Sequence, residues 1–295
     1  MIDVSGLAMQ YRSGKGIFDL SFSIGEGEVF GYLGPNGAGK TTTIRNLLGF
    51  MKANRGSCSI NALDCWSKAA EIQKNLGYIP GEIAFISGMK GNEFLRLLSD
   101  MRRIKDATTQ KKLAERFEID TNMSLRKMSK GMKQKVGINA AFMHDPAVYI
   151  LDEPTNGLDP LMQKRFVELI LEEKRRGKTI LMSSHIFDEI ERTCDRAGII
   201  RDGRLMAIED VAALKQAWQK KYIITLESTG GVEALKHAGL SLVELGQNRV
   251  EITVGGKADT FIKQLSAVTV ESLDVDPLSL EEVFMQFYGQ GDEIK

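Results

Sequence analysis

The chain has 295 residues, and its 39 basic and 39 acidic side chains give a formal net charge of zero. This length suffices for one large domain and a smaller one, whereas the balanced charge argues against broad attraction to nucleic acid or anionic lipid. No apolar run approaches the ~20 residues that a membrane-spanning helix needs, so we do not expect an integral membrane protein.

Residues 1–4 lead directly into strand-like sequence, so we expect no secretory signal. Three cysteines, Cys58, Cys65 and Cys194, lack the spacing of a metal site and are odd in number. They fit reduced, buried thiols in a cytosolic protein.

A glycine-rich loop follows an apolar segment that reads as a short buried strand (residues 28–33). The loop, residues 34–42, has the sequence GPNGAGKTT and fits the pattern G-x-x-x-x-G-K-[ST]. It is followed by apolar residues at helical spacing, so its backbone N–H groups and the helix dipole would attract phosphate. Lys40 would reach the β- and γ-phosphates, and the Thr41 hydroxyl would hold Mg²⁺. The alternative, a chance glycine turn, is less favoured in this context.

The region from about Glu82 to His144 has a mostly helical pattern, with one-sided apolar residues over 92–98 and continued helical character over 111–117. Ser129 is a good N-cap for a further helix. The basic residues of this region most simply form a solvated face, although docking against a partner is an alternative; they include Arg102, Arg103, Lys111 and Lys112.

Two carboxylates end the next apolar run, residues 147–151, which follows the helix-stopping pair Asp145-Pro146 and reads as a central parallel strand. An Asp at such a strand end holds Mg²⁺ in nucleotide-hydrolysing P-loop enzymes, which is the role we expect for Asp152. Glu153 is placed to orient and deprotonate an attacking water. The alternative is a solvated strand end with two acidic residues.

A further apolar run, residues 180–184, ends at His185. A lone histidine is more often structural than catalytic, but ligands of open α/β sheets bind at the carboxyl ends of the strands. We therefore expect His185 to contact a γ-phosphate or the attacking water. His144 and His237 have no such placement, and neither is assigned a role.

After about Leu214 the pattern changes to β-α-β-β-α-β, which suggests a small ferredoxin-like module. Its predicted elements are a strand over 222–226, a helix over 232–238, strands over 241–245 and 249–254, a helix over 259–265 and a strand over 268–275. A last helix is predicted to begin at Ser279, because Glu282 completes a capping box. Its apolar stripe is expected to be core rather than a partner surface.

Over the first two-thirds of the chain, these motifs resemble, in order, the nucleotide-binding subunit of an ATP-binding-cassette (ABC) transporter. Tyr11 matches the aromatic residue that stacks on adenine, Asp159 lies in the D-loop match, and His185 matches the switch histidine. Residues 34–42 match the Walker A loop and 148–153 the Walker B strand. The Walker A residues assigned to ATP binding are Gly34, Pro35, Asn36, Gly37, Ala38, Gly39, Lys40, Thr41 and Thr42.

The resemblance implies an α/β fold in which a P-loop NTPase cassette, residues 1–213, combines a mixed sheet with a helical subdomain inserted at about 82–144. Residues 214–295 would form a small α+β ferredoxin-like accessory module. This tail, including residues 279–284, resembles the C-terminal extension of cassettes in the bacterial drug and antibiotic export group. A dimer-stabilising or regulatory role for the module is a hypothesis.

The same resemblance implies an ATPase that uses ATP and Mg²⁺ to power export through a membrane permease on a separate chain. Two cassettes, identical or merely related, would face each other head to tail and close on ATP. The protein would lie in the cytoplasm, held at the inner face of the cell membrane by its permease, and no nucleic-acid partner is expected.

Two segments depart from the family pattern. The signature segment, which in the family acts on nucleotide bound to the opposite subunit, corresponds here to Ser129, Lys130, Gly131 and Met132. In it, Lys130 replaces a glycine and Met132 a polar residue. The glutamine that usually follows a segment like 76–80 is replaced by Gly81, which has no side-chain ligand, and the carboxylate of Glu82 is one residue out of register. We hypothesise that Gly81 loosens coupling to the membrane partner.

Two other functions remain open. A soluble cassette ATPase could act on ribosomes, DNA or a regulatory partner, although such relatives generally carry two cassettes, long coiled-coil insertions or basic arms. A regulatory ATP sensor that hydrolyses poorly, because of Gly81, Lys130 and Met132, is the other alternative.

Overall fold

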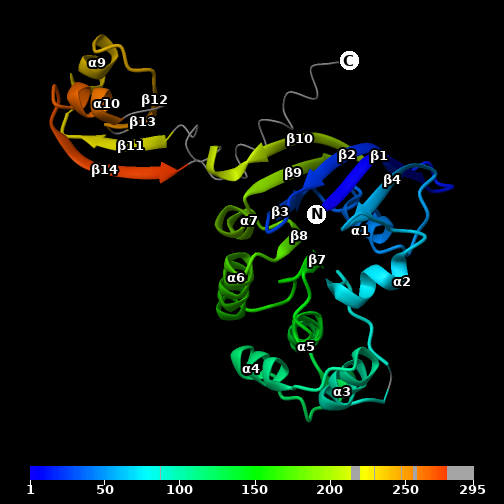
Figure 1. Ribbon diagram of the computed structural model, residues 1–295. Helices are drawn as coiled ribbons and strands as arrows, with labels where there is room; N and C mark the ends of the chain where they lie inside the picture. Colours follow the sequence, from blue (N-terminus) through cyan, green and yellow to red (C-terminus); the bar gives the residue numbers. More distant parts are fainter. Residues whose placement is uncertain (87, 214–219, 229, 247, 255–257, 278–295) are drawn as a thin grey trace. The chain divides into compact units, whose positions relative to one another are not determined.

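The computed structural model describes residues 1–86, 88–213, 220–228, 230–246, 248–254 and 258–277, so the helix predicted from Ser279 lies outside the described residues. The chain divides into two compact units, Met1–Glu209 and Asp210–Lys295 (Figure 1).

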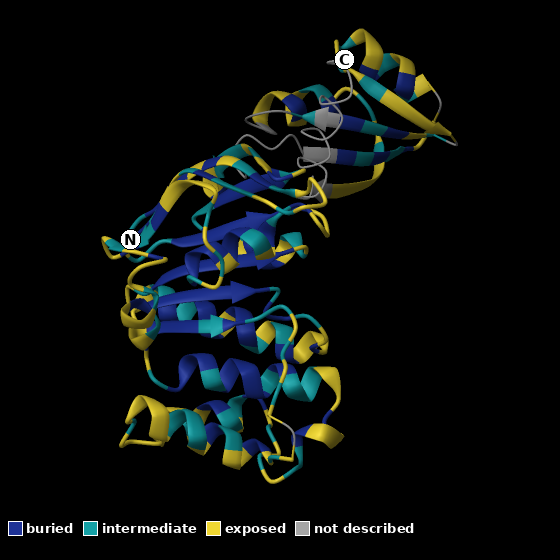
Figure 2. Ribbon diagram, turned by 90° about the vertical axis from the view of Figure 1, so that its right-hand side faces the viewer, coloured by how far each residue is buried: buried dark blue, intermediate teal, exposed yellow. Residues whose placement is uncertain are grey.

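The centre of the first unit is a six-stranded sheet with the strand order β10-β9-β3-β8-β7-β6. Its strands are β3 (Val29–Leu33), β6 (Leu76–Ile79), β7 (Val148–Asp152), β8 (Thr179–Ser184), β9 (Arg196–Arg201) and β10 (Arg204–Asp210). The pairs β9–β3, β3–β8, β8–β7 and β7–β6 are parallel. Every residue of β3, β7 and β8 is buried, as the dark strands in Figure 2 show. Burial on both faces explains their continuous apolar sequences.

A second sheet has the order β2-β1-β4-β5 and is antiparallel. It contains β1 (Ile2–Gln10), β2 (Gly16–Ile24), β4 (Arg55–Ile60) and β5 (Leu63–Asp64). Helix α1 (Lys40–Leu47) buries Ile44 and Leu47 in one core with apolar residues of both sheets. This shared core fixes the start of α1, and therefore Lys40, beside the end of β3. The predicted α/β class is confirmed.

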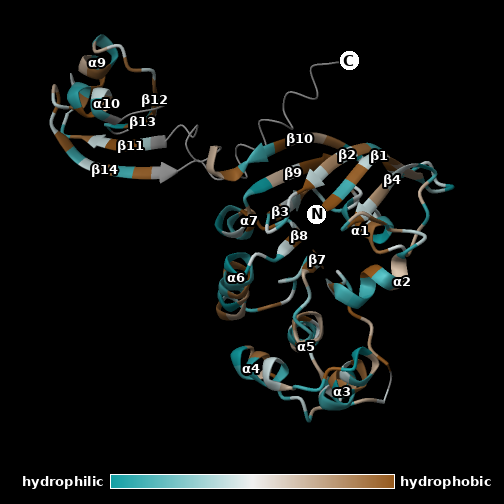
Figure 3. Cartoon of the chain, in the orientation of Figure 1, coloured by the Kyte–Doolittle hydropathy of each residue, from teal (hydrophilic) through white to brown (hydrophobic). Residues whose placement is uncertain are grey.

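A group of helices follows β6 in the chain, as predicted for the region 82–144. It consists of α3 (Gly91–Arg102), α4 (Thr108–Arg116), α5 (Lys130–Phe142) and the 3-10 turn Leu125–Lys127, while α2 (Ala69–Ile72) and the 3-10 turn Gln73–Asn75 precede β6. Figure 3 shows brown and teal residues side by side on α3 and α4, as expected of amphipathic helices. Leu95, Met128 and Val136 belong to the separate small core of this helical group.

Charged side chains connect the end of α4 to α6 (Pro160–Arg175). The guanidinium of Arg116 donates to both carboxylate oxygens of Glu172, at 2.6 and 3.0 Å. Arg165 pairs with Glu118 at 2.8 Å. These contacts attach one side of the helical group to the sheet-bearing part through surface residues.

Helix α7 (Phe187–Thr193) follows β8 and completes the helices of the first unit that the structure describes. None of the described helices is long and apolar enough to cross a membrane.

The second unit has the element order predicted for it. Its elements are β11 (Lys220–Leu226), α9 (Gly230–His237), β12 (Leu242–Gly246), β13 (Arg249–Val254), α10 (Ala258–Leu265) and β14 (Val270–Pro277). The strand order β12-β13-β11-β14 places the first and last strands side by side. Tyr222, Ile224, Leu235 and Phe261 contribute to a core separate from that of the first unit. The predicted ends of these six helices and strands differ from the observed ends by two residues or fewer.

Candidate nucleotide-binding and hydrolysis site

The glycine-rich loop joins β3 to α1, and the ammonium of Lys40 contacts backbone carbonyl groups of this loop. Gly39, the N-cap of α1, has φ +113°, a conformation that residues with a side chain rarely adopt. Lys40 is 6% exposed, and its Nζ donates to the carbonyl oxygens of Gly34 and Pro35. The loop therefore holds a buried cation at the amino end of a helix, where anions are favoured.

A cavity of about 320 Å³ lies beside this loop. Its lining comes from three segments: Tyr11, Ser13, Lys15 and Gly16; Pro35, Asn36, Gly37, Gly39, Lys40, Thr41 and Thr42; and Glu153. The Tyr11 hydroxyl lies 3.3 Å from Thr42 Oγ1 and so joins the predicted adenine-binding residue to the loop. Two predicted loop residues are not part of the lining: Ala38 is buried, and Gly34 contributes its carbonyl oxygen to Lys40.

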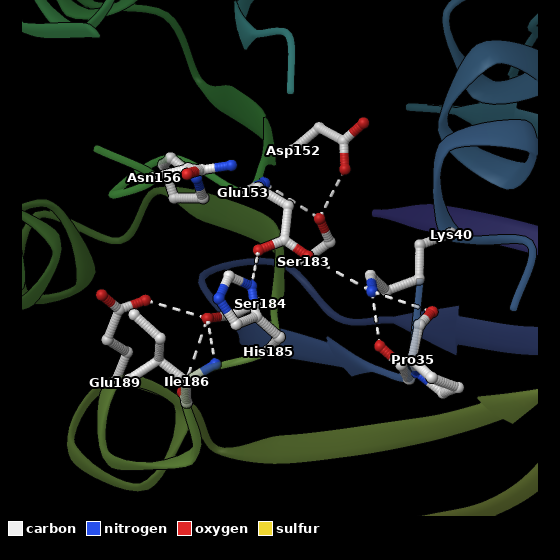
Figure 4. A network of polar contacts seen from close by, with 12 residues as sticks. Pro35, Lys40, Asp152, Glu153, Asn156, Ser183, Ser184, His185, Ile186 and Glu189 are labelled. Atoms are coloured by element: carbon white, nitrogen blue, oxygen red, sulfur yellow. Dashed lines mark hydrogen bonds and ion pairs between the residues drawn. The ribbon is translucent and has the colours of Figure 1, made fainter. Parts of the chain in front are cut away.

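Asp152 ends β7 and pairs in register with Ser183 of β8. It is 1% exposed, yet each carboxylate oxygen accepts a hydrogen bond. Thr41 Oγ1 donates to Oδ2 at 2.9 Å. Ser183 Oγ donates to Oδ1 at 2.6 Å (Figure 4). The two residues predicted to hold Mg²⁺, Thr41 and Asp152, are therefore in direct contact.

The carboxylate of Glu153 lies between two nitrogen groups. Its Oε1 is 3.2 Å from Lys40 Nζ, and its Oε2 contacts His185 Nδ1 (Figure 4). The backbone N–H of Glu153 donates to Ser183 Oγ at 3.0 Å, and its φ is +48°. The Glu153 side chain is 15% exposed and that of His185 is 55% exposed, so a carboxylate held by two neighbours faces the solvent-accessible edge. Such a group can accept a proton from water.

A buried carboxyl group supports the turn that carries His185. Ser184 Oγ donates to Glu189 Oε2 at 2.9 Å and accepts the N–H of Ile186 at the same distance (Figure 4). Burial raises the pKa of Glu189 above that of an ordinary glutamate. These bonds fix the backbone on both sides of His185.

The residues predicted as the signature segment begin α5. Ser129 is its N-cap, because its hydroxyl accepts the N–H of Met132 at 3.2 Å, as predicted. The Met132 side chain packs against the core of the helical group, and Lys130 Nζ donates to Asn156 Oδ1 at 2.8 Å. Among the described residues that line the cavity beside the loop, none belongs to this segment.

Two other predicted positions have clear structural surroundings. Asp159, the predicted D-loop residue, is the N-cap of α6 and accepts the N–H of Met162 at 3.0 Å. Gly81 lies against Asp152, since a Cβ at Gly81 would be 3.3 Å from Asp152 Oδ2. Glu82, which follows it, is exposed.

The oxygen groups of Thr41 and Asp152 suit Mg²⁺, a cation that prefers oxygen ligands and retains water. Within the described residues, no group of three or more His, Cys, Asp or Glu side chains gathers as a metal site. Because these two residues supply only part of an octahedral coordination, a Mg²⁺ ion here would complete it with substrate oxygens and water.

Sequence reasoning missed two residues of this site. Ser183 bonds both Asp152 and the backbone of Glu153, and its only sequence signal is its position two residues before His185 at a strand end. Asn156 binds Lys130, and no spacing rule connects those two positions.

A family model described as ABC transporter matches residues 17–156. The bacitracin transport ATP-binding protein BcrA of Bacillus licheniformis is 33% identical, over 99% of this chain and 98% of that protein. The ABC transporter ATP-binding protein YhcH of Bacillus subtilis is 32% identical, over 99% and 97%. A solved structure of an ATP binding subunit of an ABC transporter has a TM-score of 0.67 and 32% identity, over 73% of this chain and 92% of that one.

Proposed function

The chain belongs to the ATP-binding proteins of ABC transporters, which are ATPases, and from this premise we propose that it powers export through a separate membrane permease. The family predicted from the motifs is thereby confirmed. The observation that carries the proposal is the Glu153 carboxylate, held between Lys40 and His185 beside the phosphate loop. Transport is supported by the name of the bacitracin transport relative, which is similar over nearly its whole length. Export is supported by the name of the fluoroquinolones export ATP-binding protein of Mycobacterium tuberculosis, which is 28% identical over 98% of this chain.

In the proposed reaction, loop residues 34–42 bind the phosphates of ATP, and Lys40 neutralises their charge. Glu153 accepts the proton of the attacking water, and His185 hydrogen-bonds the γ-phosphate. Thr41 and Asp152 would hold Mg²⁺, which adds positive charge beside the phosphates when it is bound. Ser183 orients both acidic residues, because it bonds the side chain of one and the backbone of the other.

The catalytic unit would be a pair of cassettes, of identical or related chains, in head-to-tail arrangement. Each ATP would lie between Lys40 of one subunit and Ser129 of the other. In support, the signature residues lie outside the described lining of the chain's own cavity, and the capped start of α5 offers N–H groups to an anion. Closure on ATP and opening after hydrolysis would supply the two-state motion that moves the permease.

The protein would be located in the cytoplasm, at the inner face of the membrane, through its permease. The unit after residue 213 would be an accessory module that stabilises the dimer or regulates it. Truncation after Ala213 is expected to weaken dimerisation or permease-stimulated ATPase activity. Normal values of both would remove the module from the proposal.

The direct test is affinity purification of the full chain from detergent-solubilised membranes of its native host, with and without ATP. Recovery of a protein with several membrane spans is the expected result. Recovery of soluble partners alone would contradict the export proposal and favour the soluble-ATPase alternative. The proposed residue roles in ATP hydrolysis do not depend on that result, because the ATPase activity of the same purified material tests them separately.

A further inference from the structure

The start of α5 is in close contact with the turn that follows Glu153. The aliphatic part of Lys130 packs on Gly157, since a Cβ at Gly157 would lie 3.2 Å from both Cγ and Cδ of Lys130. The Lys130 ammonium continues past this contact and donates to Asn156 Oδ1 at 2.8 Å. Both the aliphatic stem and the ammonium of Lys130, which replaces a family glycine, therefore contact one turn of the same chain.

Two further contacts join the same elements. A Cβ at Gly131 would lie 2.4 Å from the carbonyl oxygen of Gly157, so the two backbones touch and only glycine fits. Gln134, one turn further along α5 and 3% exposed, donates from Nε2 to the Pro154 carbonyl at 2.7 Å. Because these contacts lie on one face of α5, the helix and the turn 153–157 form one packed unit.

The turn also determines where the Glu153 carboxylate points. The N–H of Asn156 donates to the Glu153 carbonyl at 3.1 Å and closes the turn. Glu153 has φ +48°, a conformation that a residue with a side chain keeps only when its surroundings hold it. Loss of a contact that holds the turn would therefore displace the carboxylate.

We infer that Lys130 is a positioning residue that couples the catalytic centre of its own subunit to the signature segment, and so to the ATP on the opposite subunit. The first half of this coupling is the chain of contacts Lys130, Asn156 and Glu153. The second half rests on the proposed paired arrangement, in which Ser129 contacts the partner's nucleotide. The two ATP sites would then respond to each other through α5.

The test uses the full-length protein and four variants. Lys130→Met keeps the aliphatic stem and removes the ammonium, Lys130→Arg keeps a donor, and Asn156→Ala removes the acceptor; the fourth variant combines Lys130→Met with Asn156→Ala. ATPase rates over a range of ATP concentrations give kcat, KM and the Hill coefficient, and thermal melting reports the folded fraction.

Lys130→Met and Asn156→Ala should each lower kcat about threefold to tenfold and change KM less than about twofold, because geometry rather than binding is affected. The Hill coefficient should fall toward 1. The double variant should be no slower than either single variant, since both remove one interaction. Lys130→Arg should retain most of the activity, which a purely steric role would not predict.

Lys133→Met is the matched control, because it removes a lysine ammonium from the same helix turn at a residue that does not line the cavity beside the loop. It should leave all three parameters unchanged. A cooperative wild type with an unchanged Lys130→Met variant, or additive losses in the double variant, would overturn this inference alone. A wild-type Hill coefficient of 1 would contradict the paired-site proposal and, with it, the coupling between sites.

Discussion

The ammonium of Lys40 lies 3.2 Å from a carboxylate oxygen of Glu153. The two residues come from different strand–loop connections, but β8 lies between β3 and β7, and the three parallel strands end at one edge of the sheet. The carboxylate proposed to activate water therefore also neutralises the lysine proposed to bind phosphate. Phosphate oxygens would compete with Glu153 for that ammonium.

Glu153→Gln should bind ATP at least as tightly as the wild type, because Lys40 loses a competing carboxylate. It should hydrolyse ATP about 10²–10⁴ times more slowly, the range expected for loss of a general base. Lys40→Met should instead lose most ATP binding. Equilibrium binding of a fluorescent ATP analogue and steady-state phosphate release measure the two effects.

Glu115→Gln, at an exposed position of α4, is the matched control for the loss of one carboxylate and should leave both measurements unchanged. A near-normal hydrolysis rate in Glu153→Gln would refute Glu153 as the base.

Ser183→Ala should lower both stability and turnover. The buried Asp152 loses the donor to its Oδ1, and an unsatisfied buried polar group costs about 1–3 kcal/mol of unfolding free energy. The backbone of Glu153 loses one acceptor, so we expect kcat to fall about tenfold with a smaller change in KM. Ser57→Ala, at an exposed position of β4, controls for loss of a strand hydroxyl. Equal behaviour of the two variants would contradict the role of Ser183.

His144 should make the protein less stable as the pH falls from about 6.5 to about 4. Burial, aided by Arg102, lowers the pKa of the folded His144 to about 4, and its Nε2 lies 3.2 Å from the Leu76 carbonyl oxygen. In the unfolded chain, His144 takes up a proton near pH 6.5. Its contribution to the free energy of unfolding is therefore complete above that pH and decreases below it by about 1.4 kcal/mol per pH unit.

Urea unfolding at pH 7.5 and 5.0, followed by circular dichroism, measures this effect. From pH 7.5 to 5.0, the His144→Gln variant should lose about 2 kcal/mol less unfolding free energy than the wild type. The His237→Gln variant should lose as much as the wild type. The His144 contribution would be disproved by an equal pH dependence in wild type and His144→Gln.

Gly81→Gln should strengthen the dependence of ATP hydrolysis on transported substrate, measured with the permease in lipid vesicles. The new side chain would begin 3.3 Å from Asp152 and so connect this segment to the hydrolysis site. We expect the ratio of substrate-stimulated to basal ATPase activity to rise about twofold or more. Gly81→Ala, which adds only the Cβ, should not change the ratio. The hypothesis of loosened coupling would be abandoned if Gly81→Gln behaved like Gly81→Ala.

The sequence was most informative where chemistry restricts the residue type. The phosphate loop needs glycine at Gly39 and a lysine after it, and Ser129 caps the helix that follows it, so both could be predicted from local pattern. The strand ends at Asp152 and His185 were predicted for the same reason. Local pattern also predicted the element order of the second unit.

Contacts between distant segments could not be predicted in this way. The pairing of Asp152 with Ser183 depends on β7 lying beside β8, and strand order is not encoded in the periodicity of either strand. The bond between Lys130 and Asn156 depends on how α5 packs against the turn after β7. The family pattern has a glycine where this chain has Lys130, so it gave no indication that a lysine there would bind this turn.

The attachment of α4 to α6 suggests how salt concentration enters the working cycle. Arg116, Glu172, Arg165 and Glu118 are all partly exposed, and exposed ion pairs contribute about 0–1 kcal/mol each and are screened by salt. The same attachment includes a contact of Arg116 with Glu168 and a hydrogen bond from Arg165 to the Arg116 carbonyl, and screening by salt weakens its ion pairs. The stiffness of the subunit should therefore decrease as ionic strength rises, while the buried contacts of α5 remain intact.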